Sequence, residues 1–166
     1  VDVPSKEKCA FTLLEKAAMP NLRALRIDVQ LGEQTALSVA NVLRNNAQLE
    51  QVRLYFEQMS EQRVNSLFDA LSSLPVTALC LTFWRNLSQQ SVDRFHALLQ
   101  QKRDTLVSLE VVPLSFDEGL VNGIVSKGLH GLQHLRLLRF HGRARDDLQI
   151  QNLCKALECM PHLETL

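Results

Sequence analysis

The stretch MPNLRALRI at residues 19–27 decides the fold, because its pattern Leu-x-x-Leu-x-Leu returns along the whole chain. Each copy begins with an apolar anchor at a nearly constant distance from the next one. The six anchors are Leu22, Leu49, Val76, Leu106, Leu135 and Leu163. Their spacings of 27, 27, 30, 29 and 28 residues average about 28, and such regularity is the signature of an internal repeat.

Within each copy, apolar and polar residues alternate from the fourth position onward. In the first copy, Leu25, Ile27 and Val29 would share one face. Period two predicts a short strand with one buried face. Between the copies, apolar residues recur every three or four positions, which predicts one apolar face of a helix. The residues of this helical pattern are Leu37, Ala40, Leu43, Val64, Leu67, Ala70, Leu71, Leu74, Phe95, Leu98, Leu99, Ile150, Leu153 and Leu157.

Capping residues mark where the helices are expected to begin. Ser115-x-x-Glu118 has the form of a capping box, and Asp146-x-x-Gln149 is close to one. Ser60 and Ser88 carry the hydroxyl that suits an N-cap position. A further helix is expected over about residues 5–18, ahead of the first strand. The repeating unit is therefore strand, loop, helix and turn.

A single unit of this kind cannot bury its apolar face, so neighbouring units are expected to stack around a continuous core. An ordinary doubly wound sheet would also alternate strands with helices. The fixed spacing and the lack of a glycine-rich strand-to-helix turn in the sequence favour the stacked arrangement.

Three copies carry the clearest motif, Leu22-x-x-Leu25-x-Ile27, Leu106-x-x-Leu109-x-Val111 and Leu135-x-x-Leu138-x-Phe140. They resemble leucine-rich repeats, and the long helical segments resemble the ribonuclease-inhibitor-like subclass. The resemblance covers about residues 5–166. It implies an α/β fold, a right-handed solenoid bent into a horseshoe arc of about five to six repeats, with parallel strands on the concave face and helices on the convex face. Residues 1–166 would then form a single domain, truncated at both ends and continuous with further repeats or domains of a larger chain.

The copies depart from the family at one position. The family usually places Asn or Cys three residues after the Leu-x-Leu of the strand, where it caps the turn into the loop. The corresponding residues here are Gln30, Glu57, Trp84, Leu114 and Arg143. The residue just before is often apolar, as in Val29, Phe56 and Phe83. The repeats are therefore divergent.

Composition excludes several classes of protein. Leucine supplies 31 of the 166 residues, and hydrophobic residues supply 46%. Since 18 basic residues balance 18 acidic ones, neither an intrinsically disordered chain nor a strongly nucleic-acid-directed domain is expected. No window of about 18 residues is free of charges, so no membrane span is expected.

The four cysteines, Cys9, Cys80, Cys154 and Cys159, form no CxxC pair. A disulfide framework would need denser, paired cysteines, so we expect free thiols and a cytoplasmic, reducing location. The isolated sequon at Asn86 points the other way. Cys154 and Cys159 fall in the last helical pattern, which predicts small core residues.

The sequence holds no GxGxxG, GxxxxGK[ST], HExxH or GxSxG motif. We therefore expect no enzyme activity, no catalytic residue, no metal site and no cofactor. Cys80 is the best candidate nucleophile, because the strand register places it between Arg53 and Glu110, where Arg53 would lower the pKa of the thiol a little. No histidine is placed beside it, so an incidental exposed cysteine is the favoured interpretation.

Parallel strands would present their outward side chains as rows across the concave face, free of any role in the core. The first expected row is Ala24, Gln51, Ala78, Ser108 and Leu137. The second is Arg26, Arg53, Cys80, Glu110 and Arg139. The third is Asp28, Tyr55, Thr82, Val112 and His141.

The expected site is a partner-binding surface on this face. Tyr, Trp and Arg are the commonest interface hot spots, which favours an anchor cluster of Arg26, Arg53, Tyr55 and Trp84. An alternative for Trp84 is packing beneath its own loop as a core residue. The residues predicted to bind a partner are Arg26, Asp28, Arg53, Tyr55, Thr82, Trp84, Glu110, Arg139 and His141.

A basic stretch near the C-terminus is a second candidate surface. It holds His134, Arg136, Arg139, His141, Arg143 and Arg145 without an acidic residue among them. An acidic protein surface or phosphates could contact Arg136, Arg143 and Arg145. The favoured interpretation is a solvated strand and loop, neutralised by Asp146 and Asp147 just after it. Nucleic acid would want interleaved aromatic residues, and only Phe140, expected inward, lies here.

These observations predict a protein–protein interaction module that binds a protein partner through its concave face. The alternative is a structural scaffold segment within a large assembly. The family that the repeats resemble includes enzyme inhibitors, ubiquitin-ligase substrate arms, immune sensors and GTPase activators, so the resemblance also implies a regulatory domain, for example one that supplies Arg143 or Arg145 to a partner enzyme. The fold does not choose among these functions.

Overall fold

The computed structural model describes residues 19, 21–31, 33–56, 59–83, 87–113, 128–140 and 147–166. Strands and helices alternate along these segments, as the change of period predicts. The strands are β1 (Ala24–Leu31), β2 (Gln51–Phe56), β3 (Ala78–Phe83), β4 (Ser108–Pro113) and β5 (Leu137–Phe140). The helices are α2 (Glu33–Asn45), α3 (Glu61–Ser72), α4 (Gln89–Gln101) and α6 (Asp147–Glu158). The expected helix over residues 5–18 and the expected capping box at Ser115 lie outside the described residues.

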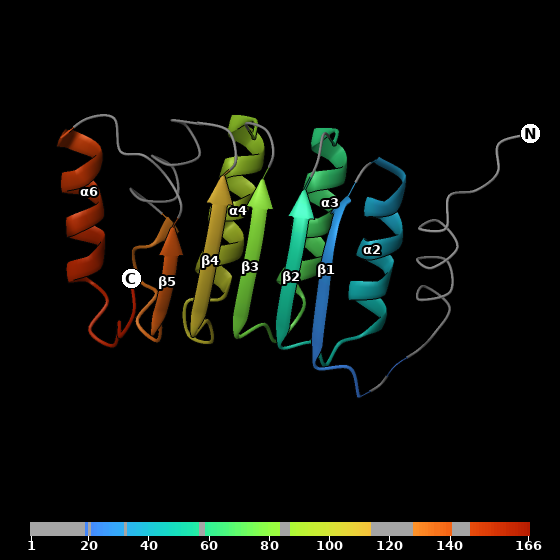
Figure 1. Cartoon of the computed structure of the whole chain (residues 1–166), viewed down its shortest axis with the longest axis horizontal. Coiled ribbons are helices and arrows are strands. Elements are labelled where there is room, and N and C mark those ends of the chain that lie inside the picture. The colour runs from blue at the N-terminus through green and yellow to red at the C-terminus, as the bar shows by residue number, and fades with distance from the viewer. Residues whose placement is uncertain are drawn as a thin grey trace, which may run out of the picture.

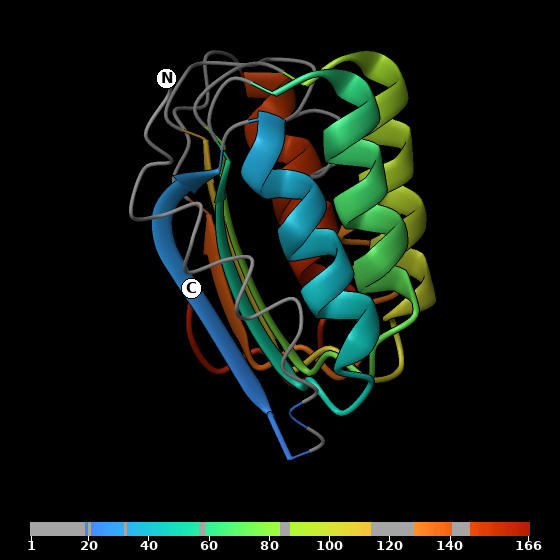
Figure 2. The same ribbon diagram turned by 90° about the vertical axis from the view of Figure 1, so that its right-hand side faces the viewer.

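The five strands form one sheet in the order β1-β2-β3-β4-β5, and each runs parallel to its neighbour. Strand order therefore follows chain order (Figure 1). Figure 2 shows the described helices on one side of this sheet. These observations confirm the α/β class and the parallel strands. We call the side of the sheet away from the helices the open face, and the side toward them the inner face.

The inner face is built from every second residue of each strand, as period two predicts. The inner residues of β2 and β3 are all buried: Val52, Leu54, Phe56, Leu79, Leu81 and Phe83. The predicted apolar faces of α3 and α4 meet them, and all of their residues are buried: Val64, Leu67, Ala70, Leu71, Phe95, Leu98 and Leu99. Since burial of a leucine or phenylalanine side chain contributes about 1.5–3 kcal/mol, this shared core is what holds the repeats together.

Two residues of the predicted helical pattern are not in the core. Leu37 of α2 is 37% exposed and Ile150 of α6 is 49% exposed. α2 and α6 are the outermost of the described helices (Figure 1). Each of them therefore has a described helix on no more than one side. A three-residue period alone does not reveal which flank of a helix lacks a neighbour.

One backbone contact recurs where the chain turns into each strand. The carbonyl of Arg23 accepts the N–H groups of Glu50 at 2.8 Å and Gln51 at 3.0 Å. The same double contact is made by the carbonyls of residues 50, 77, 107 and 136, each with two N–H groups of the next copy. At the last step, Thr165 also pairs with Leu137 in parallel. The accepting carbonyls thus follow the spacing of the sequence anchors.

Four phenylalanines fill the core where the strands lead into the helices. Phe56 and Phe83 stack with ring centroids 4.9 Å apart, and Phe68 and Phe95 stack at 5.3 Å. Phe56 and Phe83 are the apolar residues that the sequence shows just before the position where the family places Asn. In these two copies, aromatic packing therefore anchors the chain as it leaves the strand.

Polar side chains close the C-terminal ends of helices inside the protein. Asn46 Nδ2 donates to the carbonyl of Val42 at 2.7 Å. Lys102, only 7% exposed, donates from Nζ to the carbonyls of Ser72 at 2.6 Å and Leu74 at 2.5 Å. Burial lowers the pKa of Lys102 below its ordinary value. A cation at the carbonyl end of α3 is favourable, because the helix presents unpaired carbonyls and partial negative charge there.

None of the described helices has both the length and the apolar composition that crossing a bilayer requires.

Candidate interaction surface

Two of the three expected rows are present on the open face. The register of the five strands aligns Ala24, Gln51, Ala78, Ser108 and Leu137, which we call the lower row. It likewise aligns Arg26, Arg53, Cys80, Glu110 and Arg139, which we call the charged row. Both rows match the sequence prediction residue by residue.

The third row is only partly as expected. Tyr55, Thr82 and Val112 are aligned, but the residue opposite Tyr55 on β1 is Gln30 and not Asp28. The predicted place of Asp28 in this row was wrong because β1 has eight residues where β2 has six, and the register shifts between Arg26 and Gln30. Such an irregularity re-aims the side chains that follow it, and constant anchor spacing does not reveal it.

Several predicted site residues have no described placement. Trp84, His141, Arg143 and Arg145 lie outside the described residues, as do the side chains of Asp28 and Asp147. Their roles remain predictions.

Arg136, from the basic stretch, is described. Its Nη1 lies 3.5 Å from Oε1 of Glu164, and both side chains are largely exposed. His134 and His162, from the same two copies, stack with ring centroids 6.5 Å apart. This part of the basic stretch is therefore paired with an acidic residue of the sixth copy.

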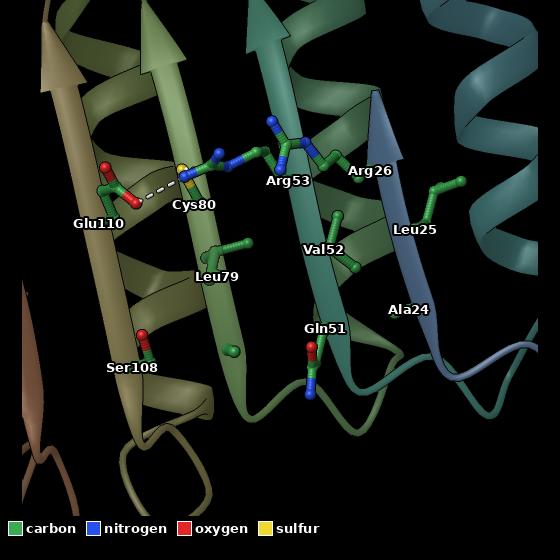
Figure 3. A pocket seen from close by; sticks show the side chains of 11 residues that line it. Ala24, Leu25, Arg26, Gln51, Val52, Arg53, Leu79, Cys80, Ser108 and Glu110 are labelled. Carbon is green, nitrogen blue, oxygen red and sulfur yellow. Dashed lines mark hydrogen bonds and ion pairs between the residues drawn. The ribbon is translucent and has the colours of Figure 1, made fainter. Parts of the chain in front are cut away.

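Arg53 is the central contact of the charged row. Its Nη2 donates to Oε2 of Glu110 at 2.9 Å, and its Nε donates to Sγ of Cys80 at 3.2 Å. The ion pair skips a strand, because Arg53 lies on β2 and Glu110 on β4 (Figure 3). Adjacent strands are about 4.8 Å apart, and the small Cys80 side chain between them leaves the long arginine room to cross.

The neighbours of Glu110 keep its carboxylate charged. Burial would raise the pKa of Glu110, but hydrogen bonds from Cys80 and Arg53 and the charges of Arg53 and Arg139 outweigh it. Its pKa therefore lies below the ordinary value. The Glu110 side chain is 18% exposed and that of Arg53 is 37% exposed, so both remain within reach of solvent.

The expected activation of Cys80 is not found. Burial raises the pKa of its thiol, the Glu110 carboxylate raises it further, and the opposing effect of Arg53 is smaller in total. The pKa lies above the ordinary value, since the thiolate would sit half-buried beside a carboxylate. The arrangement therefore does not lower the pKa of Cys80 as the sequence predicts.

A shallow hollow of about 340 Å³ lies over the lower and charged rows of β1 to β4. Figure 3 shows Arg26 leaning from β1 toward β2 and Arg53 leaning from β2 across β3. Small side chains form much of its floor, including Ala24, Ala78 and Ser108. The arrangement can accept an extended segment or a side chain of another molecule, with arginine N–H groups at its rim.

Cys154 and Cys159 are not the small core residues that the sequence predicts. Both are exposed, and Ala156 and Met160 are the buried residues of this region. Among the described residues, Cys80 and these two cysteines are free thiols. In the part of the chain that the structure describes, no three His, Cys, Asp or Glu side chains group together as metal ligands would.

Sequence reasoning missed a chain of contacts at the helix starts. Glu33, the first residue of α2, accepts hydrogen bonds from the backbone N–H and the hydroxyl of Ser60, which caps α3. Glu61, the first residue of α3, accepts one from the hydroxyl of Ser88, which caps α4, at 2.6 Å. The recurring pairs Ser60-Glu61 and Ser88-Gln89 were the available signal.

Both predicted N-caps are therefore in place, although only Ser88 makes a side-chain cap bond, accepting from the N–H of Ser91 at 3.2 Å. The hydroxyl of Ser60 is used for the contact with Glu33 instead.

Comparison with known proteins bears on the fold alone. No protein-family model matches the sequence, and no curated protein matches it. Nine chains of solved structures match. One is the tropomodulin C-terminal domain of Caenorhabditis elegans, which has 13% sequence identity and a TM-score of 0.59 over 93% of this chain and 92% of that chain. Its fold is leucine-rich-repeat-like, so the likeness supports the repeat architecture.

Proposed function

We propose that this chain is a protein-interaction module that binds a protein partner through the open face of its sheet, without bond chemistry of its own. The observation that carries the proposal is the hollow over the lower and charged rows, with Arg53 crossing from β2 to Glu110 on β4. Outward side chains on a parallel sheet do not serve the core, so their polarity and shape are available for recognition.

The shape of the binding surface is part of the proposal. We propose a right-handed solenoid of five to six repeats over residues 1–166, bent into an arc that makes the open face concave. Support comes from the in-order parallel strands, the recurring carbonyl contacts and the fold of the tropomodulin domain. The free thiols of Cys80, Cys154 and Cys159 fit our further proposal of a cytoplasmic location.

The helix side offers a weaker case for the same role. Its charged side chains form ion pairs between neighbouring helices, Arg63 with Glu33 at 3.4 Å and Arg94 with Asp69 at 2.8 Å. These ion pairs join adjacent repeats, so the charges that form them are already engaged within the protein. A scaffold function would use the helix side, where these charges already pair with one another.

The test compares variants of the two faces. Arg53→Ala with Tyr55→Ala alters the open face, and Gln62→Ala with Arg94→Ala alters exposed positions on α3 and α4. The bait is this chain, and its partner is identified by affinity purification with mass spectrometry. We expect the open-face variant to lose capture of that partner and the helix variant to keep it. Both melting temperatures should stay within about 3 °C of the unmodified protein.

Unchanged capture by the open-face variant would contradict the proposal. Loss of capture by the helix variant alone would support the scaffold function instead.

A further inference from the structure

We propose that the charged row takes an acidic, extended segment of the partner protein, and that Glu110 competes with this segment for Arg53. The inference rests on the proposed function of the open face and specifies the chemistry of its partner. Three features of the row support it: its charge, its dimensions and the position of Glu110.

The charge of the row differs from that of the chain. The chain as a whole is neutral, but the charged row holds three arginines, Arg26, Arg53 and Arg139, against Glu110 alone. The other described side chains of the open face carry no charge. At the turns into the strands, positive and negative charges balance, as in the pairs of Arg23 with Glu50 and of Arg136 with Glu164. The row therefore carries a local excess of two positive charges and is complementary to an acidic partner.

The dimensions of the row suit a short extended segment. Arg26 and Arg139 lie on the first and the fifth strand, so about 19 Å separates them at about 4.8 Å per strand. A segment in extended conformation advances about 3.3 Å per residue, so about six residues cover the row. Alternate side chains of such a segment point the same way, and the small side chains of Ala24 and Ala78 allow its backbone to approach the sheet.

Glu110 occupies part of the place where a partner carboxylate would bind. Its Oε2 accepts a hydrogen bond from Arg53 Nη2 at 2.9 Å. An incoming carboxylate would need the same geometry. Arg139 pairs in register with Glu110 and adds to its stabilisation. An incoming acidic side chain must therefore displace Glu110 from Arg53, which lowers the affinity and makes Arg53 selective for segments with several acids.

A nucleic acid would also be attracted by arginines, but the row is poorly suited to it. Tyr55 is the one aromatic side chain among the described residues of the open face, and single strands bind by stacking successive bases on several aromatic groups.

The test measures binding of fluorescent hexapeptides to the full chain by fluorescence anisotropy. The acidic probe is a peptide of alternating Glu and Thr, and the matched control probe replaces every Glu with Gln. A labelled single-stranded oligothymidylate serves as the third probe. The protein variants are Glu110→Gln, Arg53→Gln and, as a control on the helix side, Arg94→Gln, each checked for folding by circular dichroism.

We expect the unmodified chain to bind the acidic probe and not its Gln counterpart. Glu110→Gln should tighten binding about fivefold, because it releases Arg53. Arg53→Gln should weaken binding about tenfold, and Arg94→Gln should leave it unchanged. Binding should also weaken as salt is raised, since the contacts lie near the surface.

Three results would overturn the inference: equal binding of the acidic and the Gln probe, no gain of affinity in Glu110→Gln, or tighter binding of the oligothymidylate than of the acidic probe. The proposed function is tested separately. If Arg53→Ala with Tyr55→Ala loses the partner while the acidic probe fails to bind, the open face is the binding surface and the acidic chemistry is wrong.

Discussion

The inner and the open face of the same five strands are built on different rules. On the inner face, contacts join neighbouring copies, as in the stack of Phe56 on Phe83. On the open face, an ion pair skips a copy, since Arg53 reaches Glu110 two strands away. The repeat itself dictates the inner residues, because every copy must bury them. The residues of the open face need not be buried, so their arrangement is particular to this chain.

The largest effect is expected on the inner face, from Phe83→Ala. Phe83 is 1% exposed and contacts the rings of Phe56, Phe68 and Phe95. Its removal should lower the free energy of unfolding by about 3–5 kcal/mol, because it deletes buried surface and leaves a cavity. Urea denaturation followed by circular dichroism measures the change. The matched control is Thr82→Ala, the half-buried neighbour on the open face, with an expected cost below about 1 kcal/mol. Similar costs for the two variants would erase the distinction between the faces.

The second largest loss of stability is expected from Lys102→Met, at the buried C-terminal end of α3. Methionine keeps the length of the side chain but loses both hydrogen bonds to the carbonyls of Ser72 and Leu74. We expect the free energy of unfolding to fall by about 1–3 kcal/mol, because those carbonyls lose their charged donor. Urea denaturation at neutral pH measures it. A methionine variant as stable as the unmodified chain would mean that these hydrogen bonds only offset the desolvation of the ammonium group.

The pH dependence of Lys102 offers an independent check. Its pKa in the folded state is lowered by burial from the ordinary value of 10.5. The folded protein therefore releases this proton at a lower pH than the unfolded chain does. Between the folded-state pKa and 10.5, the unmodified chain should gain stability relative to Lys102→Met as the pH rises. An unchanging difference between the two proteins across that interval would contradict the burial of a charged lysine.

The sequence predicts the inner face of the sheet better than the open face. The anchors at Leu22, Leu49 and Val76 fix the strands, the inner residues and the first two rows, because hydrophobic burial imposes one periodicity on every copy. They do not fix the pairing of β1 beyond Arg26, since two additional residues are accommodated by backbone conformation and leave no mark in the spacing.

Side-chain contacts on the surface are harder to predict. The sequence placed Arg53, Cys80 and Glu110 in one row, but whether Arg53 crosses Cys80 depends on side-chain length and local room. The exposure of Cys154 and Cys159 was missed because a cysteine suits a buried and an exposed helix position almost equally well. The contact between Glu33 and Ser60 joins two copies, so a reading of each helix by itself could not reveal it.

On the open face, Glu110→Gln should have a smaller and pH-dependent effect. Burial would raise the pKa of Glu110, but its hydrogen bonds to Cys80 and Arg53 and its arginine neighbours lower it below 4.5. A carboxylate with a lowered folded-state pKa stabilises the protein above its unfolded-state pKa, and the contribution is lost as the pH falls through the folded-state pKa. The unmodified chain should thus be more stable than Glu110→Gln at neutral pH, by about 1 kcal/mol. Urea denaturation between about pH 7 and pH 2 should show the difference shrinking in acid, and a constant difference would contradict the role of the charge.

The smallest effect is expected on the outside of the helix layer, from Arg94→Ala. Arg94 Nη1 lies 2.8 Å from Asp69 Oδ1, but the two side chains are 43% and 58% exposed, so water competes for both groups. Exposed pairs of this kind contribute about 0–1 kcal/mol, and half-molar salt should remove most of the difference from the unmodified chain. Thermal unfolding at low and high salt measures both quantities. Because Arg53 and Glu110 are less exposed than this pair, the Glu110→Gln difference should resist the same salt. The contrary outcome is that salt abolishes both differences equally. The ion pair of Arg53 and Glu110 would then be no better protected from water than the pair of Arg94 and Asp69, and it would contribute no more to the free energy of unfolding.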